Sequence, residues 1–287
     1  MECKEKQIPE LYLIAGRGGN VILKGIASSP LKERLLIRND QSLHVGHYQK
    51  ELVNHLVFFA SEEQIEDTIR ELNALFPMES AFENPKTGET ECLQVFLCGK
   101  ESGNQGNPRV FLEIYKKPYR IPVQLEMILF RGQSGYPQEE ILDGNPPKQK
   151  AIAYCKFNSE EYLARCFYEV LDSLEWLDDM LWYQEIYDIL AQKAVNGRKV
   201  WDSLHRLLEE QPISFLENRL NRIKDYADYN VMEEKWQALY GDKAEGYPEW
   251  QEVIQLLGEF YTPIFEGVLK DEIFFGDWMP QLKRYLD

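Results

Sequence analysis

Three strand-like runs lie within CLQVFLCGKESGNQGNPRVFLEIYKKPYRIPVQLEMILF (residues 92–130). They are 92–98, 109–115 and 123–130, and each is rich in the β-branched and aromatic residues that favour strands. A segment rich in glycine and asparagine joins the first two runs, and a segment with proline and charge joins the last two. Because short connections of this kind join antiparallel neighbours, the region predicts a β-meander.

Beyond residue 158 the pattern changes to a helical period. Apolar residues recur every three or four positions in two stripes, and each stripe predicts an amphipathic helix. The stripes are Tyr162, Leu163, Cys166, Phe167, Val170, Leu171 and Leu174, and Trp250, Val253, Ile254, Leu257, Phe260, Tyr261, Ile264 and Phe265. NSEE (158–161) offers a cap and an acidic first turn, so it predicts the start of the first helix.

The two halves of the chain also differ in charge. Residues 1–157 contain 19 Lys/Arg and 21 Asp/Glu, whereas residues 158–287 contain 13 and 27, so the net charges are −2 and −14. All six tryptophans lie beyond residue 175, where we expect them to form the core and the contacts between helices. Two halves with such different surfaces indicate two different roles.

These patterns predict an α+β fold with two domains. An N-terminal mixed α/β domain with the antiparallel meander spans residues 1–135, and an acidic α-helical domain spans residues 158–287. Residues 136–157 are expected to be a linker, because the sequence around them is rich in glycine, proline and glutamine. We expect the strands to end near residue 130 and none to occur in 200–287.

Composition excludes several classes of protein. With 287 residues and 44% hydrophobic content, the chain can bury a full-sized core. No apolar stretch reaches the roughly 18 residues of a membrane span, and the N-terminus lacks a secretion signal, so we expect a cytoplasmic protein. The five cysteines form no CxxC pair, which favours reduced thiols. The pI near 4.8 argues against nucleic-acid binding over the whole surface, although it leaves a local basic groove open.

LYLIAGRGGNVILKGI (11–26) contains two apolar runs separated by glycines, which predicts a tight turn or a loop that approaches a phosphate. RLLI (34–37) is a candidate strand. Residues 47–60 and 61–75 are expected to be helical. In the second of these, Ser61 followed by Gln64 fits a capping box.

The histidines give the first chemical signal. LHVGHY contains an H-x-G-H motif formed by His44 and His47, which in nucleotidylyltransferases stabilises charge on ATP phosphates. No KMSKS-like loop follows it. If the segment is a helix, His47, Glu51 and His55 lie on one face, and an adjacent pair of them could ligate a divalent ion, although a polar helix face explains the spacing equally.

Two carboxylates give the second signal. Glu113 and Glu126 each lie inside an apolar strand-like run. A carboxylate in such a position costs free energy unless it is paired or binds a metal, so both are candidate catalytic residues. The alternative is that the meander has one face toward solvent, in which case the two glutamates are ordinary surface residues.

The order of segments resembles nucleotidyltransferase-fold proteins of the abortive-infection toxin type. LIAGRGGNVILKGI is similar to their glycine-pair segment, and SEEYLARCFYEVLDSLEWLDDMLWYQEIYDIL is similar to their helical region. The resemblance implies that Gly18 and Gly19 bind a nucleotide and that Glu126 is a ligand of Mg²⁺. The family's D-x-D pair falls at RLLIRND, which contains only Asp40. The resemblance therefore implies a degenerate site with little or no nucleotidyl-transfer activity.

Three functions follow from these observations. The first is a nucleotidyltransferase-like protein that binds a nucleotide, within a toxin, phage-defence or resistance system. Its test in the structure is whether Asp40, Glu113 and Glu126 approach one metal ion. The second is a non-enzymatic interaction protein, whose acidic and aromatic helical half binds a basic protein. The third is an H-x-G-H nucleotidylyltransferase that uses His44 and His47.

Overall fold

The computed structural model describes residues 9–38, 55–84, 87–103, 106–132, 137–142, 152–240 and 247–286. The chain divides into two units, Met1–Phe157 (unit 1) and Asn158–Asp287 (unit 2). Unit 1 contains the large sheet and unit 2 is mainly helical, so the predicted α+β fold class is confirmed. No helix in the described ranges combines the length and apolar composition needed to cross a membrane.

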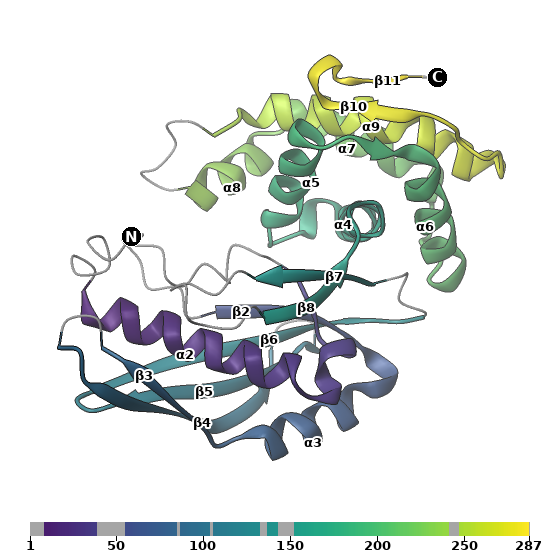
Figure 1. The fold of residues 1–287 in the computed structure, drawn as a ribbon. Helices are drawn as coiled ribbons and strands as arrows, with labels where there is room; N and C mark the ends of the chain where they lie inside the picture. The colour runs from purple at the N-terminus through teal and green to yellow at the C-terminus, as the bar shows by residue number, and fades with distance from the viewer. Residues whose placement is uncertain are drawn as a thin grey trace. The chain divides into compact units, whose positions relative to one another are not determined.

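Six strands form the main sheet of unit 1, in the order β1-β2-β6-β5-β4-β3 (Figure 1). They are β1 (Leu36–Ile37), β2 (His55–Ser61), β3 (Met78–Glu83), β4 (Thr90–Ser102), β5 (Pro108–Lys116) and β6 (Tyr119–Phe130). Consecutive β4, β5 and β6 are antiparallel, which confirms the predicted meander. β2 is parallel to β6, so a non-local pairing adds β2 and then β1 to the meander.

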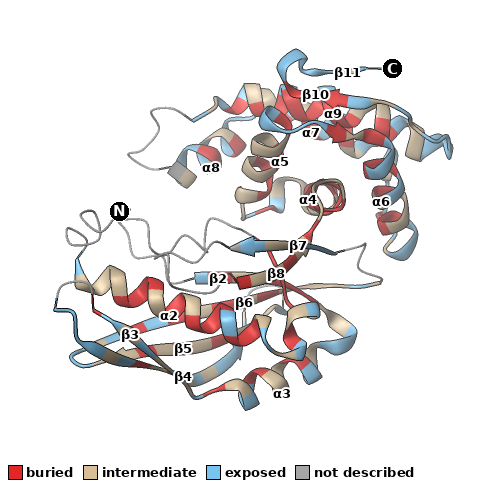
Figure 2. Cartoon of the chain, viewed as in Figure 1, coloured by how far each residue is buried: buried red, intermediate tan, exposed pale blue. Residues whose placement is uncertain are grey.

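Two helices supply the other half of the core of unit 1. They are α2 (Glu10–Ala27) and α3 (Ile65–Leu75). The short 3-10 helix η1 (Pro30–Glu33) precedes β1, and η3 (Glu62–Gln64) precedes α3. Buried residues of α2, Leu72 of α3 and alternate residues of the strands form one apolar cluster (Figure 2). The sheet therefore buries one face against these helices.

The glycine-rich segment is helical, so the predicted turn or phosphate loop is wrong. Gly18 and Gly19 lie near the middle of α2 and are buried. A Cβ at Gly18 would lie 2.3 Å from Cδ1 of Ile114 on β5, so the glycine allows the helix to approach the sheet closely. The apolar residues around the glycines follow the helical period and favour the helix despite its glycines.

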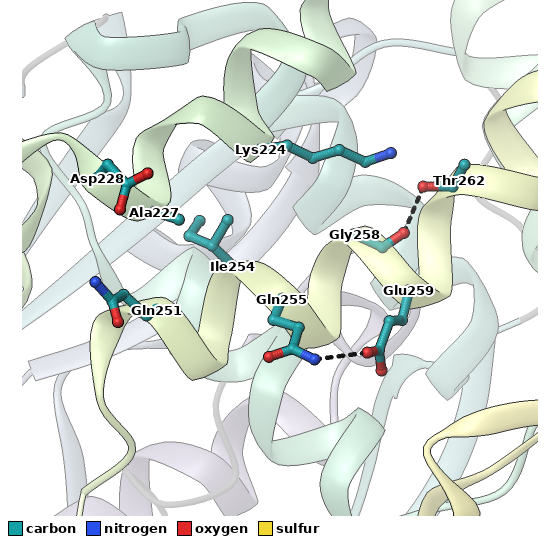
Figure 3. Close-up of a pocket in the computed structure, with 9 residues that line it drawn as sticks. All are labelled: Lys224, Ala227, Asp228, Gln251, Ile254, Gln255, Gly258, Glu259 and Thr262. Atoms are coloured by element: carbon teal, nitrogen blue, oxygen red, sulfur yellow. Dashed lines mark hydrogen bonds between the residues drawn. The ribbon is translucent and has the colours of Figure 1, made fainter.

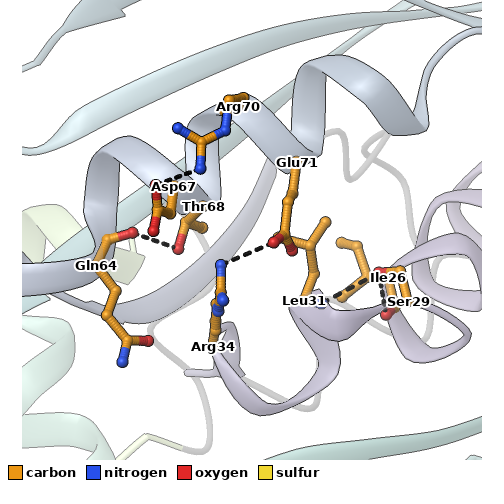
Figure 4. Close-up of polar contacts among 9 residues, drawn as sticks. All are labelled: Ile26, Ser29, Leu31, Arg34, Gln64, Asp67, Thr68, Arg70 and Glu71. Carbon is orange, nitrogen blue, oxygen red and sulfur yellow. Dashed lines mark hydrogen bonds and ion pairs between the residues drawn. The ribbon is translucent and has the colours of Figure 1, made fainter.

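Polar contacts at the junction of α2, η1 and α3 hold these elements together (Figure 4). The Ser29 hydroxyl donates to the Ile26 carbonyl at 2.9 Å and accepts from the Leu31 N–H at 3.2 Å, which caps η1. Arg34 pairs with Glu71 of α3 at 2.9 Å. These contacts fix the chain as it turns from α2 toward β1.

Three further expectations for unit 1 need correction. Residues 55–60 are in β2 rather than in a helix. Phe58 and Phe59 bury both faces of this run, so it shows no helical stripe. Residues 47–54 lie outside the described residues. Helix α3 is confirmed, but the Ser61 side chain makes no capping hydrogen bond. The expected linker contains a two-stranded sheet, β7 (Pro137–Leu142) and β8 (Ile152–Phe157).

Unit 2 contains the predicted helices. The elements are α4 (Ser159–Ser173), η5 (Leu174–Trp176), α5 (Leu181–Gln192), α6 (Gly197–Glu210), η6 (Leu216–Asn218), α7 (Arg219–Asp225), η7 (Tyr226–Asp228), α8 (Asn230–Tyr240), α9 (Trp250–Lys270) and η9 (Pro280–Leu282). The Asn158 side chain accepts from the Glu161 N–H at 2.8 Å, which confirms the predicted cap. Both predicted stripes are buried almost throughout, so they form the core of unit 2.

A small sheet contradicts the expectation of no strand in 200–287. It has three strands in the order β11-β10-β9: β9 (Val195–Asn196), β10 (Asp277–Met279) and β11 (Arg284–Leu286). Trp278 on β10 is fully buried and donates its Nε1–H to the Leu190 carbonyl at 2.9 Å. Its ring also packs against Phe260 and Tyr285. Strands this short are too brief to show a period-2 pattern in the sequence.

A largely enclosed lysine links the start of α2 to the sheet. Lys116 Nζ lies 2.5 Å from Glu10 Oε1 and 2.6 Å from Glu91 Oε2, and the lysine side chain is 12% exposed. The hydrogen bond from Lys116 lowers the pKa of both carboxyl groups below the ordinary 4.5. A carboxyl with a lowered folded-state pKa stabilises the fold above its unfolded pKa, and that stabilisation is lost as the pH falls through the folded-state pKa.

We therefore expect Lys116→Met to change the acid limb of the stability profile. The variant should lose stability at pH 7, and its stability should fall less steeply than that of the natural protein as the pH decreases below about 4.5. Urea unfolding by circular dichroism between pH 7 and pH 3 measures both effects. Arg70→Gln removes only an exposed pair with Asp67 and should leave the slope unchanged. Parallel pH profiles for Lys116→Met and the natural protein would contradict the assignment.

Candidate functional site

The second face of the unit 1 sheet carries polar and aromatic side chains. On β5, Val110, Leu112 and Ile114 are buried in the core. Arg109 and Phe111 alternate with them and are partly exposed, as the period of two in a strand requires. We call the side that bears Arg109 and Phe111 the open face of the sheet.

Four polar side chains meet on the open face. Glu126 of β6 is central: its Oε2 lies 3.1 Å from Nε2 of His55 on β2, and its Oε1 lies 3.4 Å from Nη2 of Arg109 on β5. Gln124 Nε2 lies 3.3 Å from His55 Nε2 and 3.5 Å from Glu126 Oε2. We call His55, Arg109, Gln124 and Glu126 the Glu126 cluster.

Strand register explains why these residues meet. Arg109 is the cross-strand partner of Glu126 in the antiparallel pair of β5 and β6. His55 is the partner of Gln124 in the parallel pair of β2 and β6. Side chains of cross-strand partners lie about 5 Å apart, which is within reach of an ion pair.

The Glu126 cluster has the composition of a site for an anionic ligand. The Glu126 side chain is only 15% exposed, whereas the His55 side chain is 44% exposed and Arg109 is 24% exposed. The partly buried carboxylate of Glu126 therefore lies between two side chains with nitrogen donors, and both of these side chains are more exposed than Glu126. An arginine beside a histidine can contact phosphate or carboxylate oxygens, and a histidine held by a carboxylate can also transfer a proton.

An aromatic ring and a glycine border the cluster. Phe111 is the cross-strand partner of Gln124 on one side and of Gly99 on the other. A Cβ built on Gly99 would meet nothing within 4 Å. The sheet is therefore uncovered beside the Phe111 ring, and Phe111, Gln124 and His55 form one row about 10 Å long across three strands.

The second predicted carboxylate lies apart from the first. Glu113 pairs with Arg120 at 2.9 Å, and its cross-strand partner is Pro122, four residues before Glu126. Four residues of strand correspond to about 13 Å. Glu113 and Glu126 therefore do not share a metal ion, although both lie on the open face.

Binding of Mg²⁺ by Glu126 stays a prediction, because part of the expected site lies outside the described residues. Within the described ranges, no three His, Cys, Asp or Glu side chains come close enough to hold one metal ion. Both oxygens of Glu126 face nitrogen atoms of other side chains, which leaves no carboxylate oxygen dedicated to a cation. Asp40, His44 and His47 lie outside the described residues, so their place relative to Glu126 stays a prediction.

The glycine pair also lies apart from the cluster. Gly18 packs on Ile114, whose side chain belongs to the core face of β5, and not to the open face. A role for Gly18 and Gly19 in nucleotide binding through a loop has no support from this geometry, because α2 encloses both residues. Of the predicted site residues in the described part of the chain, Glu126 is thus the one that meets several other polar side chains.

Unit 2 contains an open hollow of a different kind. It has a volume of about 590 Å³ and is lined by residues of α7, η7 and α9, among them Lys224, Gln255 and Thr262 (Figure 3). Its charged residues are Lys224, Asp228 and Glu259, which are spread along the helices rather than directed at one point. The Glu126 cluster is the more specific site, because its polar atoms converge.

No protein-family model and no curated protein matches this chain. Three solved structures show a likeness. A candidate nucleotidyltransferase from H. pylori has 10% identity and a TM-score of 0.44, with 92% of this chain and 99% of that chain covered. JHP933 from Helicobacter pylori has 10% identity and a TM-score of 0.42, with 92% and 96% covered.

The third structure is MenT4, a nucleotidyltransferase toxin from Mycobacterium tuberculosis. It has 13% identity and a TM-score of 0.40, with 84% of this chain and 76% of that chain covered. Two of the three structures are thus described as nucleotidyltransferases. At these TM-scores we take no residue role from them.

Proposed function

We propose that unit 1 binds a nucleotide on the open face of its sheet, as a nucleotidyltransferase-like protein with little or no transfer activity. The observation that carries this proposal is the convergence of His55 and Arg109 on the partly buried carboxylate of Glu126. In this arrangement Glu126 orients the two donors and does not bind Mg²⁺.

The phosphates are expected at Arg109 and His55. Arginine presents several N–H groups in one plane, so Arg109 can contact Glu126 through one nitrogen and a phosphate oxygen through another. The exposed imidazole of His55 adds a donor at the other side of Glu126. The low exposure of Glu126 keeps its charge behind the two donors rather than beside the ligand.

The base is expected on Phe111. Stacking of a base on an aromatic ring contributes about 1–3 kcal/mol and tolerates any base. The space over Gly99 admits a ring next to Phe111. This contact favours a nucleotide over other phosphorylated ligands of the same charge.

We expect weak nucleotidyl transfer because no second carboxylate lies near Glu126 among the described residues. Metal-dependent transfer needs carboxylates that hold the ion against the phosphates. In the described ranges Glu113 is too distant for this role. The sequence resemblance suggests a toxin, defence or resistance system as the setting, and this too is a proposal.

Calorimetric titration with ATP, GTP, CTP and UTP, with and without Mg²⁺, tests the proposal. We expect binding to depend little on the base, and Arg109→Gln to weaken it at least about tenfold, since a charge-assisted hydrogen bond contributes about 1.5–3 kcal/mol. Gly99→Leu should also weaken binding, because its side chain would occupy the space beside Phe111. We expect little or no nucleotidyl transfer from any of the four nucleotides.

Arg120→Gln is the matched control, because Arg120 pairs with Glu113 on the same face. Equal losses in Arg109→Gln and Arg120→Gln would contradict the site. Robust transfer that Glu126→Gln abolishes would restore an active nucleotidyltransferase. Transfer that survives Glu126→Gln but is lost in His44→Ala or His47→Ala would favour the H-x-G-H alternative.

A further inference from the structure

One tryptophan of unit 2 is exposed whereas the others are buried. The Trp176 residue is 81% exposed. The other five are at most 7% exposed; they are Trp182, Trp201, Trp236, Trp250 and Trp278. An indole ring in water leaves a large apolar area without a partner, and such rings are frequent anchors of protein interfaces.

A second exposed ring lies on an adjoining loop. Phe215, before η6, is 87% exposed. The loop of Trp176 and the loop of Phe215 are tied together by Arg219. Its Nε donates to the Ser214 carbonyl at 3.0 Å, and its Nη1 donates to the Asp172 carbonyl at 2.8 Å. The two rings are therefore carried by one connected structure.

Further polar contacts hold the loop of Trp176 in place. Glu175 pairs with Arg222 and accepts a hydrogen bond from the Tyr226 hydroxyl at 2.7 Å. Lys235 Nζ donates to the carbonyls of Glu175 and Leu177, each at 3.0 Å. The loop that bears Trp176 is thus fixed from both sides of the ring, so little ordering is required when a partner binds.

The backbone at both loops adopts conformations that favour glycine. Phe215 has φ 56° and ψ 39°, and Leu174 has φ 50° and ψ −130°. A non-glycine residue in such regions costs about 1–3 kcal/mol. A large apolar residue that is both strained and 87% exposed contributes little to folding, which leaves recognition as the role of the Phe215 ring.

The surroundings of both rings are acidic. DSLEWLDD (172–179) has four carboxylates and no lysine or arginine. Asp172, Asp178 and Glu217 are exposed. Among the described residues, no lysine or arginine pairs with Asp172 or Glu217: Arg219 contacts carbonyls and Arg222 contacts Glu175. Asp178 lies 3.8 Å from Lys235, but its side chain is 94% exposed. The net charge of −14 in unit 2 adds to this local field.

We propose that Trp176 and Phe215, with Asp172, Asp178 and Glu217, form a docking surface for a basic segment of a partner protein. Lysine or arginine side chains of the partner lie against the Trp176 ring in cation–π contact and pair with the carboxylates. Apolar side chains of the same segment cover Phe215. All of these residues belong to unit 2, so the proposed docking does not rest on the nucleotide binding proposed for unit 1.

Collisional quenching tests the surface without a partner. Because Trp176 is the exposed tryptophan, external quenchers report mainly on its ring. We expect caesium to quench more strongly than iodide, since the carboxylates concentrate cations, and added salt should reduce the difference. Trp176→Phe should remove most of the quenching by both ions. Equal quenching by caesium and iodide at low salt would contradict the acidic setting.

Peptide titration tests the partner. The probes are an eight-residue peptide of alternating arginine and leucine and its counterpart with glutamate in place of arginine. We expect the basic peptide to protect Trp176 from acrylamide in a saturable, salt-sensitive manner. Trp176→Ala and Phe215→Gly should each weaken binding at least about tenfold by calorimetry, which is typical of interface anchors.

Phe215→Gly separates recognition from folding. Glycine adopts φ 56° without steric strain. We therefore expect the unfolding midpoint of Phe215→Gly to equal or exceed that of the natural protein, while peptide binding is lost. Phe275→Ala, which removes another ring that is 64% exposed in unit 2, is the control and should retain binding. Three results would overturn the proposal. They are retained binding of the basic peptide by Phe215→Gly, equal protection of Trp176 by the acidic peptide, and protection of Trp176 by self-association of the protein without peptide.

Discussion

Replacement of Gly18 by leucine should unfold or severely loosen unit 1. A Cβ at this position would lie 2.3, 2.5 and 2.6 Å from three side-chain atoms of Ile114, which is 1% exposed. Because Ile114 is β-branched and enclosed by the core, it has few alternative rotamers. Gly18→Ala should already cost about 1–3 kcal/mol by overpacking, partly offset by its higher helix propensity, and Gly18→Leu should cost more.

Gly25 is the matched control within the same helix. Its Cβ would lie 2.5 Å from the terminal methyl of Met78, which can move aside more easily than a β-branched side chain. Gly25→Ala should therefore cost less than Gly18→Ala. Ile114→Ala should rescue Gly18→Ala in a double-mutant cycle. Hydrogen exchange of the peptide that spans β5 measures these effects, and unchanged protection in Gly18→Leu would refute the close packing.

The glycine segment also shows where sequence reasoning failed. Glycine suggests a turn when read alone, yet in α2 it removes a side chain where a helix meets a sheet. Which of these holds depends on a tertiary contact, because Ile114 lies 96 positions further along the chain than Gly18. The long helix α9 was predictable, since its apolar stripe is uninterrupted over several turns.

The same distinction applies to the site. Glu126 could be identified because a carboxylate inside an apolar strand costs free energy unless it has a partner. Its partners Arg109 and His55 could not, because the meander alone does not reveal the register, and nothing local indicates that β2 pairs with β6 in parallel. The expected helix over 47–60 also placed His55 on the wrong kind of element. A strand assignment for HLVFFAS would have placed His55 at the start of a strand, on the face opposite Leu56 and Phe58.

Removal of one buried carboxylate should strongly destabilise unit 2. Glu161 is 2% exposed, and it lies 2.8 Å from Arg165, which is 6% exposed, and 2.5 Å from Arg206. Burial lowers the pKa of the Arg165 guanidinium below its ordinary value, which reflects the cost of keeping this charge away from water. Loss of the carboxylate removes the ion-pair partner that lies 2.8 Å from this guanidinium. Glu161→Gln should therefore cost about 3–5 kcal/mol.

Two further variants distinguish this pairing from simple packing. Arg206→Gln removes a cation that is 29% exposed and leaves Glu161 with Arg165, so its cost should be smaller. Glu161→Leu combined with Arg165→Met replaces the buried pair by apolar groups and should recover much of the loss, because neither charge then remains buried. Urea unfolding followed by tryptophan emission reports on unit 2 specifically, since all six tryptophans lie there. If the double variant were no more stable than Glu161→Gln, the loss would come from side-chain shape rather than from an unpaired charge.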